Sequence, residues 1–157
     1  NRAAYLHSVV IRHDDAGCGV PVVFMITSTK TMVPLEERLR RLKNATPFVT
    51  TPIFMIDCSK TEVAAIKAVF PEPKVRFCHW QFFRALKPQS VGKINDPDDR
   101  LSALEELRAL VWTKSPVEFY LMWDKYQSKY EKYKDWMAYL RVQWMKDMDK
   151  WWIGCRI

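Results

Sequence analysis

Two stretches near the start of the chain have the composition of β-strands. Residues 5–13 (YLHSVVIRH) and 20–28 (VPVVFMITS) are rich in β-branched and aromatic side chains. The segment between them, DDAGCG, carries the Asp and Gly residues that favour turns. The pattern predicts an antiparallel hairpin, with Asp14 and Asp15 in its turn.

The segment after the hairpin has helical periodicity. In PLEERLRRLKN (residues 34–44), three leucines recur on one helical face: Leu35, Leu39 and Leu42. Charged side chains occupy the other positions, and Pro34 suits the first position of a helix because no N–H donor is needed there. We therefore predict an amphipathic surface helix.

A strand, a helix and another strand follow. PIFMID (residues 52–57) is a continuous apolar run, typical of a strand covered on both faces, and KVRFC (residues 74–78) is a second short strand. Between them, Ser59 and Glu62 have the spacing of a capping box. The positions expected to be buried on this helix are Val63, Ile66, Val69 and Phe70. The order of elements predicts an α/β fold with a mixed sheet.

The second half of the chain is predicted to be helical. Asp96 and Pro97 give a start signal for one helix, and Ser115, Pro116 and Glu118 give another. The first of these helices has a regular leucine stripe: Leu101, Leu104, Leu107 and Leu110. Both stretches are therefore expected to pack one face against neighbouring helices.

An aromatic stripe continues from the second of these helices to the end of the chain. Its apolar positions recur at steps of three or four: Phe119, Trp123, Tyr126, Tyr130, Tyr133, Met137, Leu140, Trp144, Met148 and Trp151. We expect a break near Lys134 and Asp135. Interleaved Trp, Tyr and Lys would also suit stacking on nucleic-acid bases, but a stripe with this spacing is more typical of a helical core.

The length and composition of the chain suit a single domain with or without an appendage. Its 157 residues are 48% hydrophobic, enough for one substantial core. No run approaches the roughly 18 apolar residues of a membrane span, and the start lacks a secretory pattern, so we expect a soluble intracellular protein. Since the chain opens on Asn1 without an initiator Met and stops after an aromatic cluster, we also expect a piece of a longer protein.

The cysteines give no sign of a cross-linked or zinc-stabilised frame. They are scattered without a C-x-x-C pair: Cys18, Cys58, Cys78 and Cys155. This spacing favours reduced thiols in a core over disulfides or a structural zinc site.

The net charge of +7 is concentrated in the first half of the chain. Residues 30–93 hold twelve Lys or Arg against five Asp or Glu, whereas residues 101–157 hold ten against eight. A basic surface attracts polyanions, because neutralised phosphates release condensed counterions. Many proteins are moderately basic, so charge alone leaves nucleic-acid binding open.

Asp57 stands at the end of the apolar run PIFMID and has no evident capping role, because Ser59 and Glu62 already cap the next helix. Ligands gather beyond the carboxyl ends of parallel strands, which makes Asp57 a candidate functional carboxylate. The alternative is a polar residue that merely ends a strand. A two-metal site for phosphoryl transfer would need further carboxylates.

Three segments together carry a resemblance to a known family: GCGVPVVFMITS (residues 17–28), the stretch from residue 54 to residue 86, and the Trp-rich helices. They resemble the transposase domain of Mutator-like DNA elements, which has a ribonuclease-H-like fold and an Asp-Asp-Glu active site. The most specific part is Asp57 followed by the phrase VFP (residues 69–71) and the cluster from Cys78 to Leu86. The resemblance covers nearly the whole chain.

The resemblance implies that Asp57 is the second catalytic Asp and a ligand of Mg²⁺ or Mn²⁺. The first Asp and the Glu would lie upstream of residue 1 and beyond residue 157, and no residue here replaces them, neither the acids of the hairpin turn nor Glu105 and Glu106. We therefore expect a ribonuclease-H-like α/β core fragment without its first strand (residues 1–94), then an all-helical insertion (residues 95–157). This piece is expected to be inactive by itself.

One motif departs from the family, which usually shows Cys-x-x-His where this chain has Cys78 and Gln81. Gln is a poor zinc ligand, so zinc is disfavoured. We favour Cys78 and Trp80 as core residues beside the site, with His79 exposed. The alternative is that Cys78 and His79 bind a metal or orient a catalytic group.

The resemblance also implies a DNA partner, the transposon ends, and a nuclear location. Candidate phosphate contacts are Lys60, Arg84 and Lys87, with Lys93 nearby, although these could equally be solvated charges. No membrane partner is expected, and a homo-oligomer is compatible with the family. Two functions follow for the full-length protein: metal-dependent DNA strand cleavage and transfer, or, in a domesticated derivative, DNA-binding transcriptional regulation without catalysis. A third reading is an α/β module in which Asp57 is incidental.

Overall fold

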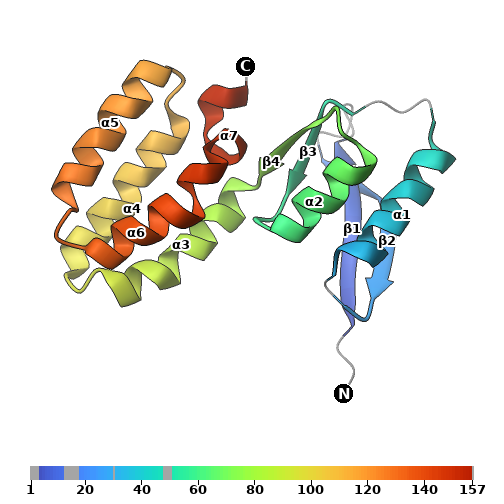
Figure 1. Ribbon diagram of the computed structural model, residues 1–157, viewed down its shortest axis with the longest axis horizontal. Coiled ribbons are helices and arrows are strands. Elements are labelled where there is room, and N and C mark those ends of the chain that lie inside the picture. Colours follow the sequence, from blue (N-terminus) through green and yellow to red (C-terminus); the bar gives the residue numbers. More distant parts are fainter. Residues whose placement is uncertain (1–3, 13–17, 30, 48–50, 157) are drawn as a thin grey trace. The chain divides into compact units, whose positions relative to one another are not determined.

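The computed structural model describes residues 4–12, 18–29, 31–47 and 51–156, and the predicted turn with Asp14 and Asp15 lies outside these ranges. Helices predominate in a mixed α/β chain (Figure 1). The chain divides into two compact units, Asn1–Pro52 with Ser59–Lys74, and Ile53–Cys58 with Val75–Ile157.

The first unit contains the predicted hairpin. Strands β1 (Tyr5–Arg12) and β2 (Gly19–Thr27) pair antiparallel, with an irregularity in register after Val9. Met25 and Thr27 are buried, whereas the alternating residues Phe24 and Ile26 are 65% and 73% exposed. Because successive side chains on a strand point to opposite faces, one face of the hairpin is covered and the other carries exposed apolar residues.

Two helices that contact each other complete the first unit, α1 (Met32–Ala45) and α2 (Lys60–Val69) (Figure 1). Helix α1 begins two residues before Pro34, which is tolerated because the N–H groups of a first turn have no partner within the helix. The buried residues of the two helices are Leu35, Leu39, Ala65, Ile66 and Val69. The predicted cap is confirmed, since Ser59 Oγ accepts a hydrogen bond from the N–H of Glu62 at 3.3 Å.

The second unit holds a separate two-stranded sheet of β3 (Ile53–Ile56) and β4 (Lys74–Phe77). The N–H of Lys74 donates to the carbonyl oxygen of Pro52 at 2.9 Å, and the N–H of Cys78 donates to the carbonyl oxygen of Ile56 at 2.8 Å. Residue numbers rise in the same direction along both strands from the first bond to the second, so the strands are parallel.

The prediction that the first of these strands is covered on both faces is wrong. Ile53 and Met55 are 42% and 60% exposed. Within the part of the chain that the structure describes, β3 pairs with β4 alone. An apolar run cannot show how many neighbouring elements a strand has, and here the neighbours cover only one of its faces.

The rest of the second unit is helical: α3 (His79–Lys93), α4 (Pro97–Trp112), α5 (Pro116–Lys129), α6 (Lys134–Gln143) and α7 (Met148–Trp151), with short 3₁₀ turns η1 (Met145–Asp147) and η2 (Ile153–Arg156). Helix α3 contacts α4 and α6, and α4 also contacts α5 (Figure 1). The predicted caps are confirmed: Asp96 accepts hydrogen bonds from the N–H groups of Asp98 and Asp99, and Ser115 from that of Glu118. The predicted break falls between α5 and α6, and α6 begins at Lys134.

Aromatic side chains form the core of these helices, as the stripe predicts, but the stripe missed Trp136 and Phe82, which are also buried. The largest fully buried ones are Trp136, Trp151, Tyr126, Tyr130, Phe82 and Phe119. The rings of Phe82 and Trp151 stack with centroids 5.1 Å apart and planes 16° from parallel. Such rings bury large apolar areas and therefore dominate the packing energy.

The leucine stripe of α4 differs from the prediction at its start. Leu101 is 60% exposed, whereas the residues that face the core are Ala103, Leu107, Leu110 and Val111. These four positions follow the spacing of one helical face, and Leu101 lies outside it. An α-helix has 3.6 residues per turn, so leucines spaced three residues apart shift gradually around its surface. The first leucine of the stripe therefore lies outside the buried face.

The expectation that the cysteines lie in the core is wrong, because Cys18 is exposed and the other three are half-buried. Helix α3 belongs to the compact helical unit, and the predicted domain boundary after residue 94 stays a prediction.

In the described ranges, no helix is both long and apolar enough to span a membrane.

Candidate functional site

Asp57 lies at the edge of the β3–β4 sheet where both strands end. It directly follows Ile56, the last residue of β3, and its side chain is exposed. The hydrogen bond from Cys78 to the carbonyl of Ile56 sets the strand register, so the start of α3 lies beside Asp57. The carboxyl ends of parallel strands are the usual place for ligands in such sheets.

Gln81 is the residue that the fold brings to Asp57. It lies in the first turn of α3, and its Nε2 donates a hydrogen bond to Oδ2 of Asp57 at 3.2 Å. The sequence marked Gln81 only as a departure from the Cys-x-x-His pattern. Its position four residues beyond the end of β4, in a helix that starts at the same sheet edge, is the signal that could have paired it with Asp57.

The predicted burial of the two residues before Gln81 is reversed. Trp80, expected in the core, is 63% exposed. His79, expected to be exposed, is half-buried: its Nε2 lies 2.7 Å from the carbonyl oxygen of Trp151, and its ring meets Trp112 edge-on at 5.0 Å. Helix α3 packs through Phe82, and His79 precedes it by three residues on the same face. Trp80 therefore points away from that face.

Trp80 lies against a cation on the surface of α3. The guanidinium carbon of Arg84 is 5.0 Å from the centroid of the Trp80 ring, the geometry of a cation–π contact. Arg84 and Lys87 are both exposed, and α3 contains no Asp or Glu. The remaining candidate cation, Lys60, is the exposed first residue of α2 in the other unit.

The donors around Asp57 suit a hard cation better than zinc. Mg²⁺ takes oxygen ligands, commonly one or two carboxylates together with water and substrate phosphates. The Asp57 carboxylate and the amide of Gln81 fit part of such a set. Across the described residues there is no group of three or more His, Cys, Asp or Glu that could hold a metal. Cys78 and His79 thus lack the four-ligand set of a structural zinc site.

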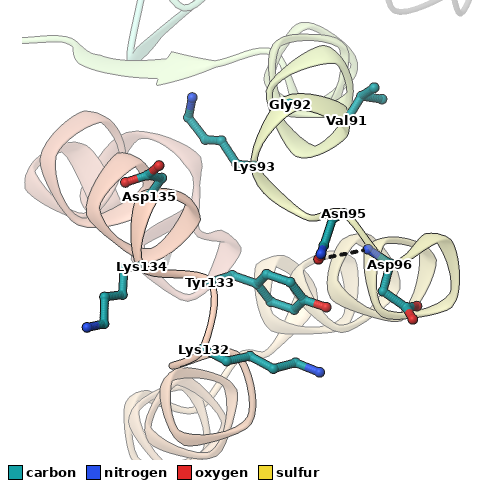
Figure 2. A pocket seen from close by; sticks show the side chains of 9 residues that line it. All are labelled: Val91, Gly92, Lys93, Asn95, Asp96, Lys132, Tyr133, Lys134 and Asp135. Atoms are coloured by element: carbon teal, nitrogen blue, oxygen red, sulfur yellow. Dashed lines mark hydrogen bonds between the residues drawn. The ribbon is translucent and has the colours of Figure 1, made fainter.

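Away from Asp57, a hollow of about 850 Å³ lies where α3 ends and α6 begins (Figure 2). Its lining combines three cations, Lys93, Lys132 and Lys134, with the carboxylates of Asp96 and Asp135. The lining therefore carries charges of both signs and favours neither an anion nor a cation.

The hollow borders a polar cluster centred on Asp99. Lys132 pairs with the Asp99 carboxylate at 2.6 Å, and the hydroxyl of Tyr133 donates to the same oxygen at 2.6 Å. These two hydrogen bonds, from Lys132 first and from Tyr133 second, lower the pKa of Asp99. The same contact with Asp99 raises the pKa of Tyr133. The cluster links the start of α4 to the turn before α6, which is a structural role.

A scan against protein-family models gives no match for this chain, and a search of the curated proteins gives none either.

Proposed function

We propose that this chain is part of the catalytic domain of a Mutator-like transposase, in which Asp57 is one of the carboxylates that hold the catalytic metal. The observation that carries the proposal is the position of Asp57. It is exposed at the carboxyl end of a strand in a parallel pair, and Gln81 from the next helix contacts it. A carboxylate at this edge can meet both a divalent cation and a phosphodiester.

The order of elements supports a ribonuclease-H-like core that lacks its first strand. An antiparallel hairpin, a helix, a strand, a helix and a parallel strand precede the helical region. Among the described residues, the antiparallel pair β1–β2 and the parallel pair β3–β4 form separate sheets, so the single mixed sheet remains part of the proposal. The exposed apolar residues Phe24 and Ile26 on β2, and Ile53 and Met55 on β3, are compatible with further elements of a larger domain covering these strands.

The chemistry would belong to the full-length protein. Asp57, with the amide of Gln81 beside it, would be one of the residues that hold Mg²⁺ or Mn²⁺, and the metal would supply Lewis-acid activation of a water or of a DNA 3′-hydroxyl. A two-metal reaction needs several converging carboxylates, and Asp57 provides one, so we expect no cleavage by this chain alone. The proposed contacts to DNA phosphates are Lys60, Arg84 and Lys87. The proposed location of the full-length protein is the nucleus.

The test compares DNA cleavage by the full-length protein with that of an Asp57→Asn form. We expect metal-dependent nicking at transposon ends in the first and none in the second. Asp124→Asn is the matched control, because Asp124 is also exposed and also accepts a hydrogen bond from a Gln side chain, that of Gln127. Equal cleavage by the Asp57 and Asp124 variants would reject the catalytic role of Asp57.

The alternative, a transposase-derived DNA-binding regulator without catalysis, is favoured by one observation. Gln81 replaces the usual His of the family motif at the residue that contacts Asp57. A regulator would bind DNA with the same affinity with or without Mg²⁺ and would leave it intact. Cleavage of the DNA in the presence of Mn²⁺ would exclude this alternative.

A further inference from the structure

Trp80 is the most exposed tryptophan of the chain. It is 63% exposed, whereas five tryptophans are buried in the helical core: Trp123, Trp136, Trp144, Trp151 and Trp152. Trp112 is 52% exposed, but its ring contacts His79 edge-on. Burying a large apolar ring gains free energy, so a ligand that covers the indole beside the candidate active site would be stabilised by the contact.

The neighbours of Trp80 form a continuous polar surface on α3. Arg84 follows Trp80 by four residues and Gln81 by three, so all three side chains lie on adjacent parts of the helix surface. Gln81 in turn contacts Asp57. This surface therefore places the indole of Trp80, the guanidinium of Arg84 and the amide of Gln81 beside the carboxylate of Asp57.

The charge of α3 indicates what kind of ligand this surface would take. The helix carries Arg84, Lys87 and Lys93 and contains no acidic residue. A flat aromatic face beside cations is the combination that binds single-stranded nucleic acids, because each base can stack and each phosphate can meet a positive charge. An acidic peptide would match the charge but would make no use of the flat face of the indole.

We propose that Trp80 is a stacking platform for an unpaired DNA base, with Arg84 and Lys87 contacting the adjacent phosphates. The inference rests on the proposed function, since it takes DNA as the ligand and places an unpaired nucleotide next to Asp57. Base stacking tolerates any sequence, because every base has a π face. Arg84 covers part of the ring in the free protein and has the guanidinium geometry that suits a phosphate oxygen.

The test measures binding of a short, fluorescently labelled oligodeoxythymidine to this chain by fluorescence anisotropy. We expect Trp80→Ala to weaken binding about tenfold, the size of one lost stacking contact, and Trp80→Phe to retain most of the affinity. Arg84→Gln should reduce the slope of log affinity against log salt by about 0.7, the value for one phosphate of a single strand. Unchanged affinity in Trp80→Ala would overturn the proposal.

Matched controls lie on α5. Tyr120 is an exposed aromatic residue, 51% accessible, and Lys125 is an exposed cation on the same helix. Tyr120→Ala and Lys125→Gln should leave both the affinity and the salt slope unchanged. Losses in these variants equal to those in Trp80→Ala and Arg84→Gln would show nonspecific binding and overturn the assignment to α3.

A spectroscopic measurement separates stacking from a general loss of structure. An oligonucleotide that carries 2-aminopurine should lose fluorescence on binding to the wild-type chain and to Trp80→Phe, but not to Trp80→Ala. A duplex of the same length should bind equally well to the wild-type chain and to Trp80→Ala, because its bases are already stacked. Quenching that persists in Trp80→Ala would overturn the stacking role.

The outcomes distinguish this inference from the proposed function. If Trp80→Ala binds as the wild type does while Asp57→Asn abolishes cleavage by the full-length protein, stacking is rejected and the transposase assignment stands. If Trp80→Ala weakens single-strand binding while Asp57→Asn cleaves normally, the platform stands and the catalytic assignment is rejected. If the wild-type chain prefers a single-stranded RNA to the DNA, the DNA ligand proposed here is wrong.

Discussion

Gln81 donates a hydrogen bond to Asp57 from a position 24 residues further along the chain, with 3.2 Å between Nε2 and Oδ2. The contact exists because β3 and β4 are parallel and end at the same edge, where α3 begins. It gives the carboxylate a neighbour that can orient it without neutralising its charge.

The first prediction concerns metal binding at this pair. In Mn²⁺ titrations followed by NMR, we expect the backbone signals nearest Asp57 to broaden first, and Asp57→Asn to remove the effect. Gln81→Glu should strengthen it, because a second carboxylate adds charge and oxygen donors. Gln81→Ala should change the free energy of unfolding by less than about 1 kcal/mol, because the lost hydrogen bond is exposed to water. Broadening that survives Asp57→Asn would contradict the prediction.

The second prediction concerns Arg76, a buried cation on β4 that is 5% exposed. Its Nη1 donates to the carbonyl of Asp149 at 2.5 Å, and its Nη2 donates to the carbonyl of Cys155. Lys cannot reproduce this fork, so Arg76→Lys should lower the free energy of unfolding by about 1–3 kcal/mol. Hydrogen exchange at the amides of Trp152 and Cys155 should become faster.

The control for this variant is Arg141→Lys. Arg141 also forks, with its Nε and Nη2 donating to Oε1 of Gln127, but these hydrogen bonds are exposed to water. We expect a change within about 0.5 kcal/mol, as is usual for surface substitutions. Equal losses in the two variants would contradict the special role of Arg76.

The third prediction concerns the buried pair Trp136 and Tyr126, in which the indole Nε1 donates to the phenol oxygen at 2.8 Å. Tyr126→Phe would leave the indole N–H without an acceptor in a site from which water is excluded. Urea denaturation should show a loss of about 1–3 kcal/mol, the usual cost of an unsatisfied buried donor. Tyr120→Phe, at an exposed position on the same helix, should cost little, and a similar loss there would refute the argument.

The fourth prediction concerns alkaline pH. Burial raises the pKa of Tyr130 from 10.0 to about 12, and the neighbouring Glu106 carboxylate acts in the same direction. Above pH 10.0 the unfolded chain releases this proton while the folded chain keeps it, so stability must fall as pH rises from 10.0 to about 12. Tyr130→Phe should make this fall smaller. Urea midpoints measured across that range would test it, with Tyr120→Phe as the control, and an unchanged slope in Tyr130→Phe would contradict it.

Signals that act within a few residues could be read from the sequence. The caps at Ser59, Asp96 and Ser115 depend on a side chain and an N–H group two or three positions away, and all three form as predicted. The aromatic stripe beyond Phe119 is buried for the same reason, because its period repeats the helical turn. The sequence also singled out Asp57 and Gln81, each for a separate reason.

By itself, then, the sequence determined the hairpin, α1, β3, α2 and β4, the starts of α4, α5 and α6, and the aromatic core of the helical region. It gave no prediction for helix α3, which carries Gln81. The tertiary structure decided which residues meet. The contact between Asp57 and Gln81 depends on the parallel register of two strands, and the reversed burial of His79 and Trp80 depends on which face of α3 packs against other helices. Neighbouring residues on a helix point about 100° apart, so periodicity alone cannot tell which of two adjacent aromatic rings faces the core.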